Sequence, residues 1–166
     1  PNVSHGGIAF GQNPDCLYDI TKQIKAKAKQ PIIMKLSPNV TDITEMAKAA
    51  EAAGSDALSL INTITGMKID IHKRTFALAN KTGGLSGPAI KPVAVRMVYQ
   101  VAQAVKLPII GMGGIANAED AIEFMLAGAT GVAVGAMNFV NPYTTQEVVK
   151  GIEDYMERYK VENLSE

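Results

Sequence analysis

Four short runs of consecutive apolar residues recur along the chain, and an amphipathic segment follows each run. The runs lie at about 32–36, 57–61, 108–111 and 131–135. None of them alternates between apolar and polar positions, as a strand with one wet face would. The pattern therefore predicts strands that are buried on both faces, which is typical of a parallel sheet.

The segments between these runs have helical periodicity, and their ends carry capping residues. The predicted helices span about 13–29, 41–54, 90–104, 117–128 and 144–159. Asn13 and Asn117 are the expected N-caps, and Gly54 is expected to end its helix in the left-handed conformation. Thr144 with Glu147 matches the spacing of a capping box for the last helix.

The regular alternation of strand and helix predicts an α/β fold with parallel strands and right-handed crossovers. Four strand–helix units are clear, and helix ends followed by a tight glycine turn and a strand are common in (β/α)₈ TIM barrels. One connection, residues 62–87, is too long for a simple turn. Connections of that length are usually functional. Alternation over 68–72 predicts that part of it forms a small hairpin over the site.

Composition excludes several classes of function. Sixteen basic residues balance sixteen acidic ones, so the chain has no positive excess for a nucleic-acid backbone. No apolar run reaches the roughly 18 residues of a membrane span. One cysteine, Cys16, excludes an internal disulfide and is consistent with a reducing cytoplasm. His5 and His72 are isolated, so no metal site is expected.

Two of the predicted strands end in small residues that could bind an anion. Gly113-Gly114 follows the third strand, Gly135-Ala136 follows the fourth, and Met112 and Met137 flank these positions. Small residues let backbone N–H groups approach a phosphate, and the last strands of a barrel often form such a site. The alternative is that these glycines only make tight turns. Their occurrence at consecutive strand ends favours phosphate binding.

The first two predicted strands end in polar residues instead. Lys35 ends an otherwise apolar strand, where a lysine is costly unless it is paired or faces a site, and the alternative is a side chain that reaches solvent. Asn62-Thr63 ends the second strand and could hydrogen-bond a planar polar ligand or simply complete a turn. The segment 83–88 is rich in glycine but matches no standard phosphate loop, so a hinge and a ligand contact both stay open.

Taken together, the segments at the strand ends resemble a known family. The matching segments are Pro1-Asn2-Val3, His5 to Gly11, Lys35-Leu36-Ser37-Pro38-Asn39-Val40, Ile61-Asn62-Thr63, Thr82 to Pro92 and Ile110 to Ile115. In this order, over essentially the whole chain, they resemble class 1B dihydroorotate dehydrogenases. The resemblance implies that residues 1–166 are the carboxyl-terminal part of a single FMN-binding (β/α)₈ barrel domain. It also implies oxidation of dihydroorotate to orotate in de novo pyrimidine biosynthesis.

The resemblance also implies a role for individual residues. Lys35 would contact the flavin ring and stabilise the negative charge of reduced flavin. Ile61 and Gly87 would line the flavin. The phosphate would be held by Gly113, Gly114, Gly135 and Ala136, and orotate would be hydrogen-bonded by Asn2, Asn62 and Thr63. The electron acceptor implied is an iron–sulfur flavoprotein subunit.

The resemblance assigns the catalytic base to a cysteine that would directly precede Pro1, and Cys16 lies in the following helix. No catalytic residue is therefore expected within this chain, and the 166 residues alone are expected to be inactive. Two alternatives stay open, a non-catalytic half-barrel fragment and another FMN- or phosphate-binding barrel enzyme. A half-barrel would expose apolar strand faces and two sheet edges, so it is expected to aggregate, to form an oligomer such as a dimer, or to need its missing half.

Overall fold

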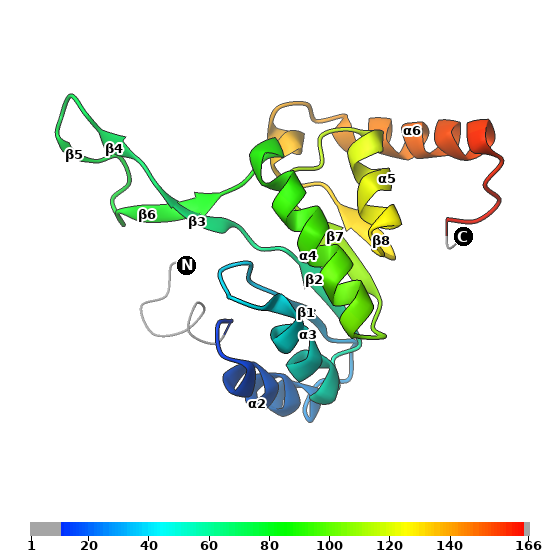
Figure 1. Cartoon of the computed structure of the whole chain (residues 1–166), viewed down its shortest axis with the longest axis horizontal. Helices are drawn as coiled ribbons and strands as arrows, with labels where there is room; N and C mark the ends of the chain where they lie inside the picture. The colour runs from blue at the N-terminus through cyan, green and yellow to red at the C-terminus, as the bar shows by residue number, and fades with distance from the viewer. Residues whose placement is uncertain (1–10, 165–166) are drawn as a thin grey trace.

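A computed structural model describes residues 11–164, and its centre is a four-stranded parallel sheet (Figure 1). The strands are β1 (Ile33–Lys35), β2 (Ala57–Leu60), β7 (Ile109–Met112) and β8 (Gly131–Ala133). They lie in the order β1-β2-β7-β8, and every neighbouring pair is parallel. All four carboxyl ends consequently lie at one edge of the sheet, as the strand–helix alternation predicts.

Within residues 11–164, five α-helices accompany the sheet. They are α2 (Pro14–Lys25), α3 (Ile43–Ala52), α4 (Lys91–Ala104), α5 (Ala118–Leu126) and α6 (Thr144–Tyr159). Helices that follow one another in sequence contact one another in space, while α4 packs on β2 and β7 and α5 packs on β7 and β8. This is the arrangement of consecutive units of a (β/α)₈ barrel, with helices on one face of the sheet (Figure 1).

Most of the predicted helix ends are confirmed. Asn13 accepts a hydrogen bond from the Cys16 backbone N–H at 3.0 Å, and Asn117 accepts one from Asp120 at 2.9 Å. The predicted capping box of α6 is wrong, because Thr144 is the first helical residue and its hydroxyl donates to the Asn141 carbonyl at 2.7 Å. The helix begins one residue earlier than the capping box requires, with Tyr143 at the N-cap position, and periodicity alone does not locate a helix end to a single residue.

The core lies between the sheet and its helices. Phe124 of α5 is completely buried, and its ring packs so closely on β7 that a Cβ at Gly111 would lie 2.7 Å from a ring carbon. Burying a side chain of this size contributes about 1.5–3 kcal/mol. Gly111 therefore serves the packing of α5 on the sheet, and a larger residue there would push the helix away.

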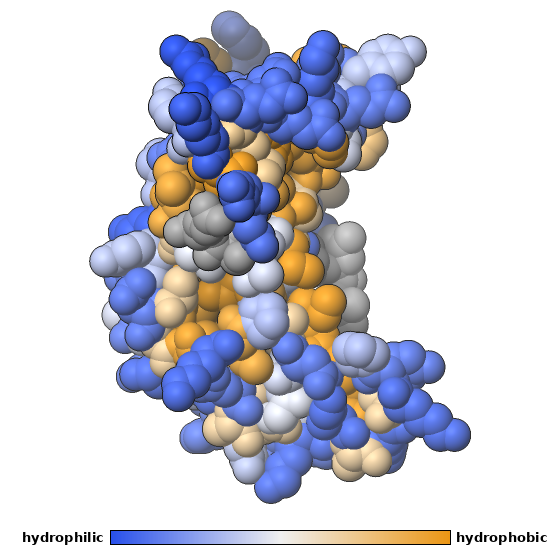
Figure 2. All heavy atoms as spheres, turned by 90° about the vertical axis from the view of Figure 1, so that its right-hand side faces the viewer, coloured by the Kyte–Doolittle hydropathy of each residue, from blue (hydrophilic) through white to orange (hydrophobic). Residues whose placement is uncertain are grey.

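The prediction that the strands are buried on both faces is wrong for β1 in this chain. Ile33 is 49% exposed and Lys35 is also exposed, while Met34 between them is half-buried. Figure 2 likewise shows apolar side chains gathered across the middle of one side of the molecule, between hydrophilic side chains. The helices cover one face of the sheet, so the strands carry more apolar surface than this chain buries.

The long connection after β2 forms an antiparallel arm. It contains β3 (Ile64–Met67), β4 (Ile69–Asp70), β5 (Thr75–Phe76) and β6 (Thr82–Leu85). β3 pairs with β6 and β4 pairs with β5, so the predicted hairpin is larger than 68–72. The arm projects away from the helices and the central sheet (Figure 1). It returns to the sheet through the 3₁₀ turn η1 (Pro88–Ile90) that leads into α4.

Candidate functional site

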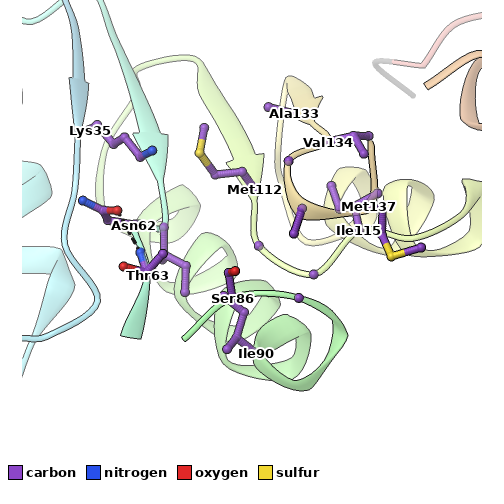
Figure 3. A pocket seen from close by; sticks show the side chains of 16 residues that line it. Lys35, Asn62, Thr63, Ser86, Ile90, Met112, Ile115, Ala133, Val134 and Met137 are labelled. Carbon is purple, nitrogen blue, oxygen red and sulfur yellow. Dashed lines mark hydrogen bonds between the residues drawn. The ribbon is translucent and has the colours of Figure 1, made fainter. Parts of the chain in front are cut away.

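One pocket lies at the carboxyl ends of all four parallel strands (Figure 3). It has a cavity volume of about 160 Å³ and opens to solvent. Its lining residues come from the ends of the four strands and from the segments that follow them: Lys35, Ile61, Asn62, Thr63, Ser86, Gly87, Ile90, Met112, Gly113, Gly114, Ile115, Ala133, Val134, Gly135, Ala136 and Met137. Ligands of parallel α/β folds bind at this edge of the sheet.

The pocket brings together nearly all the residues that the sequence singled out. The predicted cofactor residues Lys35, Ile61, Gly87, Gly113, Gly114, Gly135 and Ala136 all line it, and so do Asn62 and Thr63. Asn2 lies outside the described residues. The binding role of each residue stays a prediction, but their convergence on one cavity is a property of the fold.

Sequence reasoning did not assign a site role to several lining residues. They are Ser86, Ile90, Met112, Ile115, Ala133, Val134 and Met137. Met112 and Met137 had a signal, because each is next to a glycine site. The others are ordinary apolar or small residues whose place in the pocket depends on how the segments after the strands turn.

The polar end of the pocket comprises Lys35, Asn62 and Thr63, which Figure 3 shows grouped together. Lys35 is the last residue of β1 and is exposed. Within residues 11–164 its ammonium forms no ion pair, so its charge is available to a ligand. The Asn62 backbone N–H donates to the Leu36 carbonyl at 3.1 Å, which holds the end of β2 beside the end of β1.

The glycine end of the pocket comprises Gly113, Gly114, Gly135 and Ala136. Gly113 has a φ of +127° and Gly114 one of +85°, which favour glycine. A Cβ at Gly114 would lie 2.8 Å from the Gly87 carbonyl oxygen and 2.9 Å from the Lys91 Cβ. The missing side chain at Gly114 is thus explained by packing, whereas a Cβ at Gly135 would meet no atom within 4 Å.

Several backbone donors at the glycine end are free to bind a ligand. Among the described residues, the N–H groups of Gly113, Gly114, Gly135 and Ala136 have no hydrogen-bond acceptor. Unpaired backbone donors are uncommon unless water or a ligand satisfies them. Two sets of such donors at neighbouring strand ends fit the oxygen atoms of a phosphate group.

An ion-pair cluster lies behind the glycine end. Lys91 Nζ contacts Asp120 Oδ1 at 2.6 Å and Glu123 Oε2 at 2.6 Å, and Asp120 Oδ2 accepts from the Ala116 N–H at 2.8 Å. These contacts join the start of α4 to the start of α5 and to the segment after Gly114. The cluster therefore fixes the two segments that meet at Gly87 and Gly114.

The charges of this cluster are mutually stabilised. Burial alone would raise the pKa of Asp120, but hydrogen bonds from Lys91 and from the Ala116 N–H outweigh it and hold the pKa below its ordinary value. Hydrogen bonds to Asp120 and Glu123 raise the pKa of Lys91 above its ordinary value. Both groups are charged near neutral pH, so the pair is intact under ordinary conditions.

Other reactive residues lie away from the pocket. Cys16 is exposed in the first turn of α2 and does not line the pocket, so it has no packing role. Within residues 11–164 no three His, Cys, Asp or Glu side chains are grouped as a metal site would require. Over the same range, every helix is too short or too polar to span a bilayer.

Parallel strands whose carboxyl ends converge on a pocket with a cation and free backbone donors define a ligand-binding portion of a (β/α)₈ barrel. A solved structure of dihydroorotate dehydrogenase from Eimeria tenella, in complex with ferulenol, has the same fold. It superposes with a TM-score of 0.80 over 99% of this chain and 50% of its own, at 23% sequence identity.

Sequence comparison identifies the family. The model of the dihydroorotate dehydrogenase family matches residues 1–156. The catalytic subunit of dihydroorotate dehydrogenase B (NAD(+)) from Lachnoclostridium phytofermentans is 69% identical over 166 residues, and that from Alkaliphilus oremlandii is 66% identical. The chain belongs to the dihydroorotate dehydrogenase family. It spans about half the length, 55%, of these two relatives.

Proposed function

We propose that the protein containing this chain is an FMN-dependent dihydroorotate dehydrogenase that oxidises dihydroorotate to orotate in pyrimidine biosynthesis. The observation that carries the proposal is the pocket in which the cation of Lys35 and the polar Asn62-Thr63 segment lie together with two glycine segments that have free N–H donors. High identity to the catalytic subunits of dihydroorotate dehydrogenase B supports the same activity.

The glycine end would bind the phosphate of FMN. The free N–H groups of Gly113, Gly114, Gly135 and Ala136 would donate to its oxygen atoms. Gly135 lines the pocket, and a Cβ there would meet no atom within 4 Å, so this segment has room beside it that a tightly packed turn would lack. Ile61 and Gly87, which lie between the two ends, would line the flavin.

The polar end would bind the substrate and the ring edge of the flavin. Asn62 Oδ1 already accepts from the Thr63 N–H at 2.8 Å, so the Asn62 amide group has its N–H donors left for a ligand. Among the described residues the Thr63 hydroxyl has no partner either. Both can donate to the carboxylate or carbonyl oxygens of orotate. Asn2, outside the described residues, would add a third hydrogen bond.

FMN, when bound, supplies the acceptor for the two electrons that leave dihydroorotate. The Lys35 ammonium stabilises the negative charge that develops at this end of the pocket. Apolar residues such as Ile90, Ile115 and Val134 limit the access of water to the pocket. Of the described lining residues none is Asp, Glu, His or Cys, so we assign the proton acceptor to a group outside residues 11–164.

The electron acceptor would be a second protein. The relatives are named as catalytic subunits of an NAD(+)-dependent enzyme, which supports a partner subunit that transfers electrons to NAD. We propose an iron–sulfur flavoprotein for this role and an oligomeric assembly. If a partner subunit transfers the electrons to NAD, the catalytic subunit without that partner should reduce NAD poorly.

The test is anaerobic reduction of the flavin by substrate. The protein would be purified from the complete coding sequence, its FMN content measured by absorbance, and dihydroorotate added in a stopped-flow instrument. We expect bound FMN and substrate-dependent bleaching. Absence of bleaching in FMN-loaded protein would contradict the proposal. The polypeptide of residues 1–166 alone, measured in parallel, is expected to show little or no activity.

A further inference from the structure

The amide group of Asn39 bridges the segment after β1 to the backbone at the base of the arm. Asn39 Nδ2 donates to the Thr63 carbonyl at 3.1 Å, and Asn39 Oδ1 accepts from the Thr65 N–H at 2.8 Å. The two bonds flank Ile64, the first residue of β3. The Asn39 side chain thus pairs with the backbone at Thr63 and Thr65 as a neighbouring strand would. This pairing begins where the pocket-lining Asn62-Thr63 segment ends.

The orientation of this amide group is fixed by its neighbours. The Ser37 hydroxyl oxygen accepts from both the backbone N–H and Nδ2 of Asn39 at 3.2 Å. Gln12 holds the main chain of the same residue, because its side-chain amide donates to the Asn39 backbone carbonyl at 3.1 Å. Exchanging the oxygen and nitrogen of the Asn39 amide would place a donor against the Thr65 N–H and an acceptor against the Thr63 carbonyl. Only one orientation satisfies every group.

Thr63 is also held from its other side. A Cβ at Gly84 of β6 would lie 2.6 Å from the Thr63 Cβ, so the Thr63 side chain packs directly on the Gly84 backbone. The Asn62 N–H is bonded to the Leu36 carbonyl at 3.1 Å. The Asn62-Thr63 segment is therefore held at its start by Leu36, which directly follows β1, at its side by β6 and at its end by Asn39.

We propose that Asn39 is a positioning residue that sets the place of the Asn62-Thr63 segment and thereby the affinity for the substrate. The proposal rests on the function given above, in which Asn62 and Thr63 bind orotate. Asn39 does not line the pocket, so its effect would be transmitted through the backbone of Thr63. The role needs an adjacent donor and acceptor, which asparagine supplies and aspartate does not.

The test compares Asn39→Asp and Asn39→Leu in protein made from the complete coding sequence. Asn39→Asp keeps the bond from the Thr65 N–H but sets a carboxylate oxygen against the Thr63 carbonyl, while Asn39→Leu removes both bonds. We expect each variant to bind orotate about 5- to 10-fold more weakly and to raise KM for dihydroorotate similarly. FMN content and kcat should change less than twofold.

Two readouts separate positioning from general destabilisation. The Thr65 amide should exchange its hydrogen faster in Asn39→Leu but not in Asn39→Asp. The orotate affinity of Asn39→Asp should improve as the pH falls and the new carboxyl group is protonated, because the protonated group can again donate. Asn13→Asp is the matched control, since the Asn13 side chain only accepts a hydrogen bond, at 3.0 Å from the Cys16 N–H.

The outcomes distinguish this proposal from the proposed function. Wild-type protein that binds FMN but does not oxidise dihydroorotate would overturn both. An active wild type with unchanged KM and orotate affinity in both Asn39 variants would overturn only the positioning role. A fall in kcat and FMN content equal to the loss of orotate affinity would overturn it as well, because it would indicate a general loss of structure.

Discussion

In the Gly113-Gly114 segment of the pocket the backbone is constrained by close packing, whereas at the polar end side-chain hydrogen bonds hold the segments in place. Gly114 lies against Gly87 and Lys91 with no room for a Cβ, and the Lys91–Asp120 ion pair supports it from behind. Lys35 and Asn62, in contrast, are exposed. Substitution of Gly114 should therefore act mainly through the structure, whereas substitution of Lys35 should act mainly through the chemistry of the site.

The largest expected effect is on the chemistry of the polar end. Lys35→Ala should slow flavin reduction by about 10²–10³-fold, because it removes a preorganised charge from the reacting end of the pocket. FMN affinity should fall by less than about 10-fold, since the phosphate donors remain. Stopped-flow reduction and flavin titration measure the two quantities.

The control for Lys35 is another exposed lysine that does not line the pocket. Lys68→Ala, in the arm, should leave both quantities unchanged. Unchanged reduction in Lys35→Ala together with lost FMN affinity would mean that Lys35 binds the phosphate, and the division between the two ends would not hold.

The second largest effect is structural and lies at the glycine end. Gly114→Ala should lower the free energy of unfolding by about 2–4 kcal/mol, because the residue has a φ of +85° and its new Cβ would lie 2.8 Å from the Gly87 carbonyl oxygen. Chemical denaturation of the complete protein, with and without FMN, measures the loss. An unchanged unfolding midpoint would contradict this, because it would mean that the segments of Gly87 and Gly114 can move apart without loss of stability.

A matched substitution at the same end should affect binding instead of stability. Gly135→Ala adds the same methyl group where no atom lies within 4 Å, so the free energy of unfolding should change by less than about 0.5 kcal/mol. FMN affinity should fall by about 10-fold, because the methyl group occupies space beside the phosphate donors. Equal FMN affinity of wild type and Gly135→Ala would mean that the phosphate does not bind at this segment.

The smallest effect concerns the ion pair behind the glycine end. Asp120→Asn should cost about 1–2 kcal/mol of unfolding free energy at pH 7, because Asp120 accepts bonds from Lys91 and from the Ala116 N–H. The folded protein lowers the pKa of Asp120, so this contribution is present above the ordinary value of 3.8 and is lost as the pH falls through the folded value.

The pH dependence of this substitution is its check. The difference between wild type and Asp120→Asn should be constant from about pH 5 to 9 and should shrink below pH 4. Glu123→Gln, whose side chain is 48% exposed, should cost less than about 1 kcal/mol. A larger loss of unfolding free energy in Glu123→Gln than in Asp120→Asn would mean that Glu123, and not Asp120, is the carboxylate that supports the glycine end.

The α/β class, the four parallel strands and most of the helix ends could be predicted from the sequence alone. Apolar runs of strand length and caps such as Asn13 and Asn117 are local signals. They act over a few residues, so they do not depend on how the elements pack together. The sequence also indicated that Lys35, Asn62, Gly113 and Gly135 lie at one edge, since parallel strands bring their carboxyl ends together.

How the segments after the strands meet depends on the tertiary structure and could not be predicted from the sequence. The amide of Asn39 reaches Thr63 and Thr65, more than twenty residues away in sequence, and no periodicity predicts that contact. The tight approach of Gly114 to Gly87 has the same origin, as does the exposure of Ile33 on a strand expected to be buried. These features depend on which elements pack together, and long-range packing leaves no signature within the short windows that sequence patterns cover.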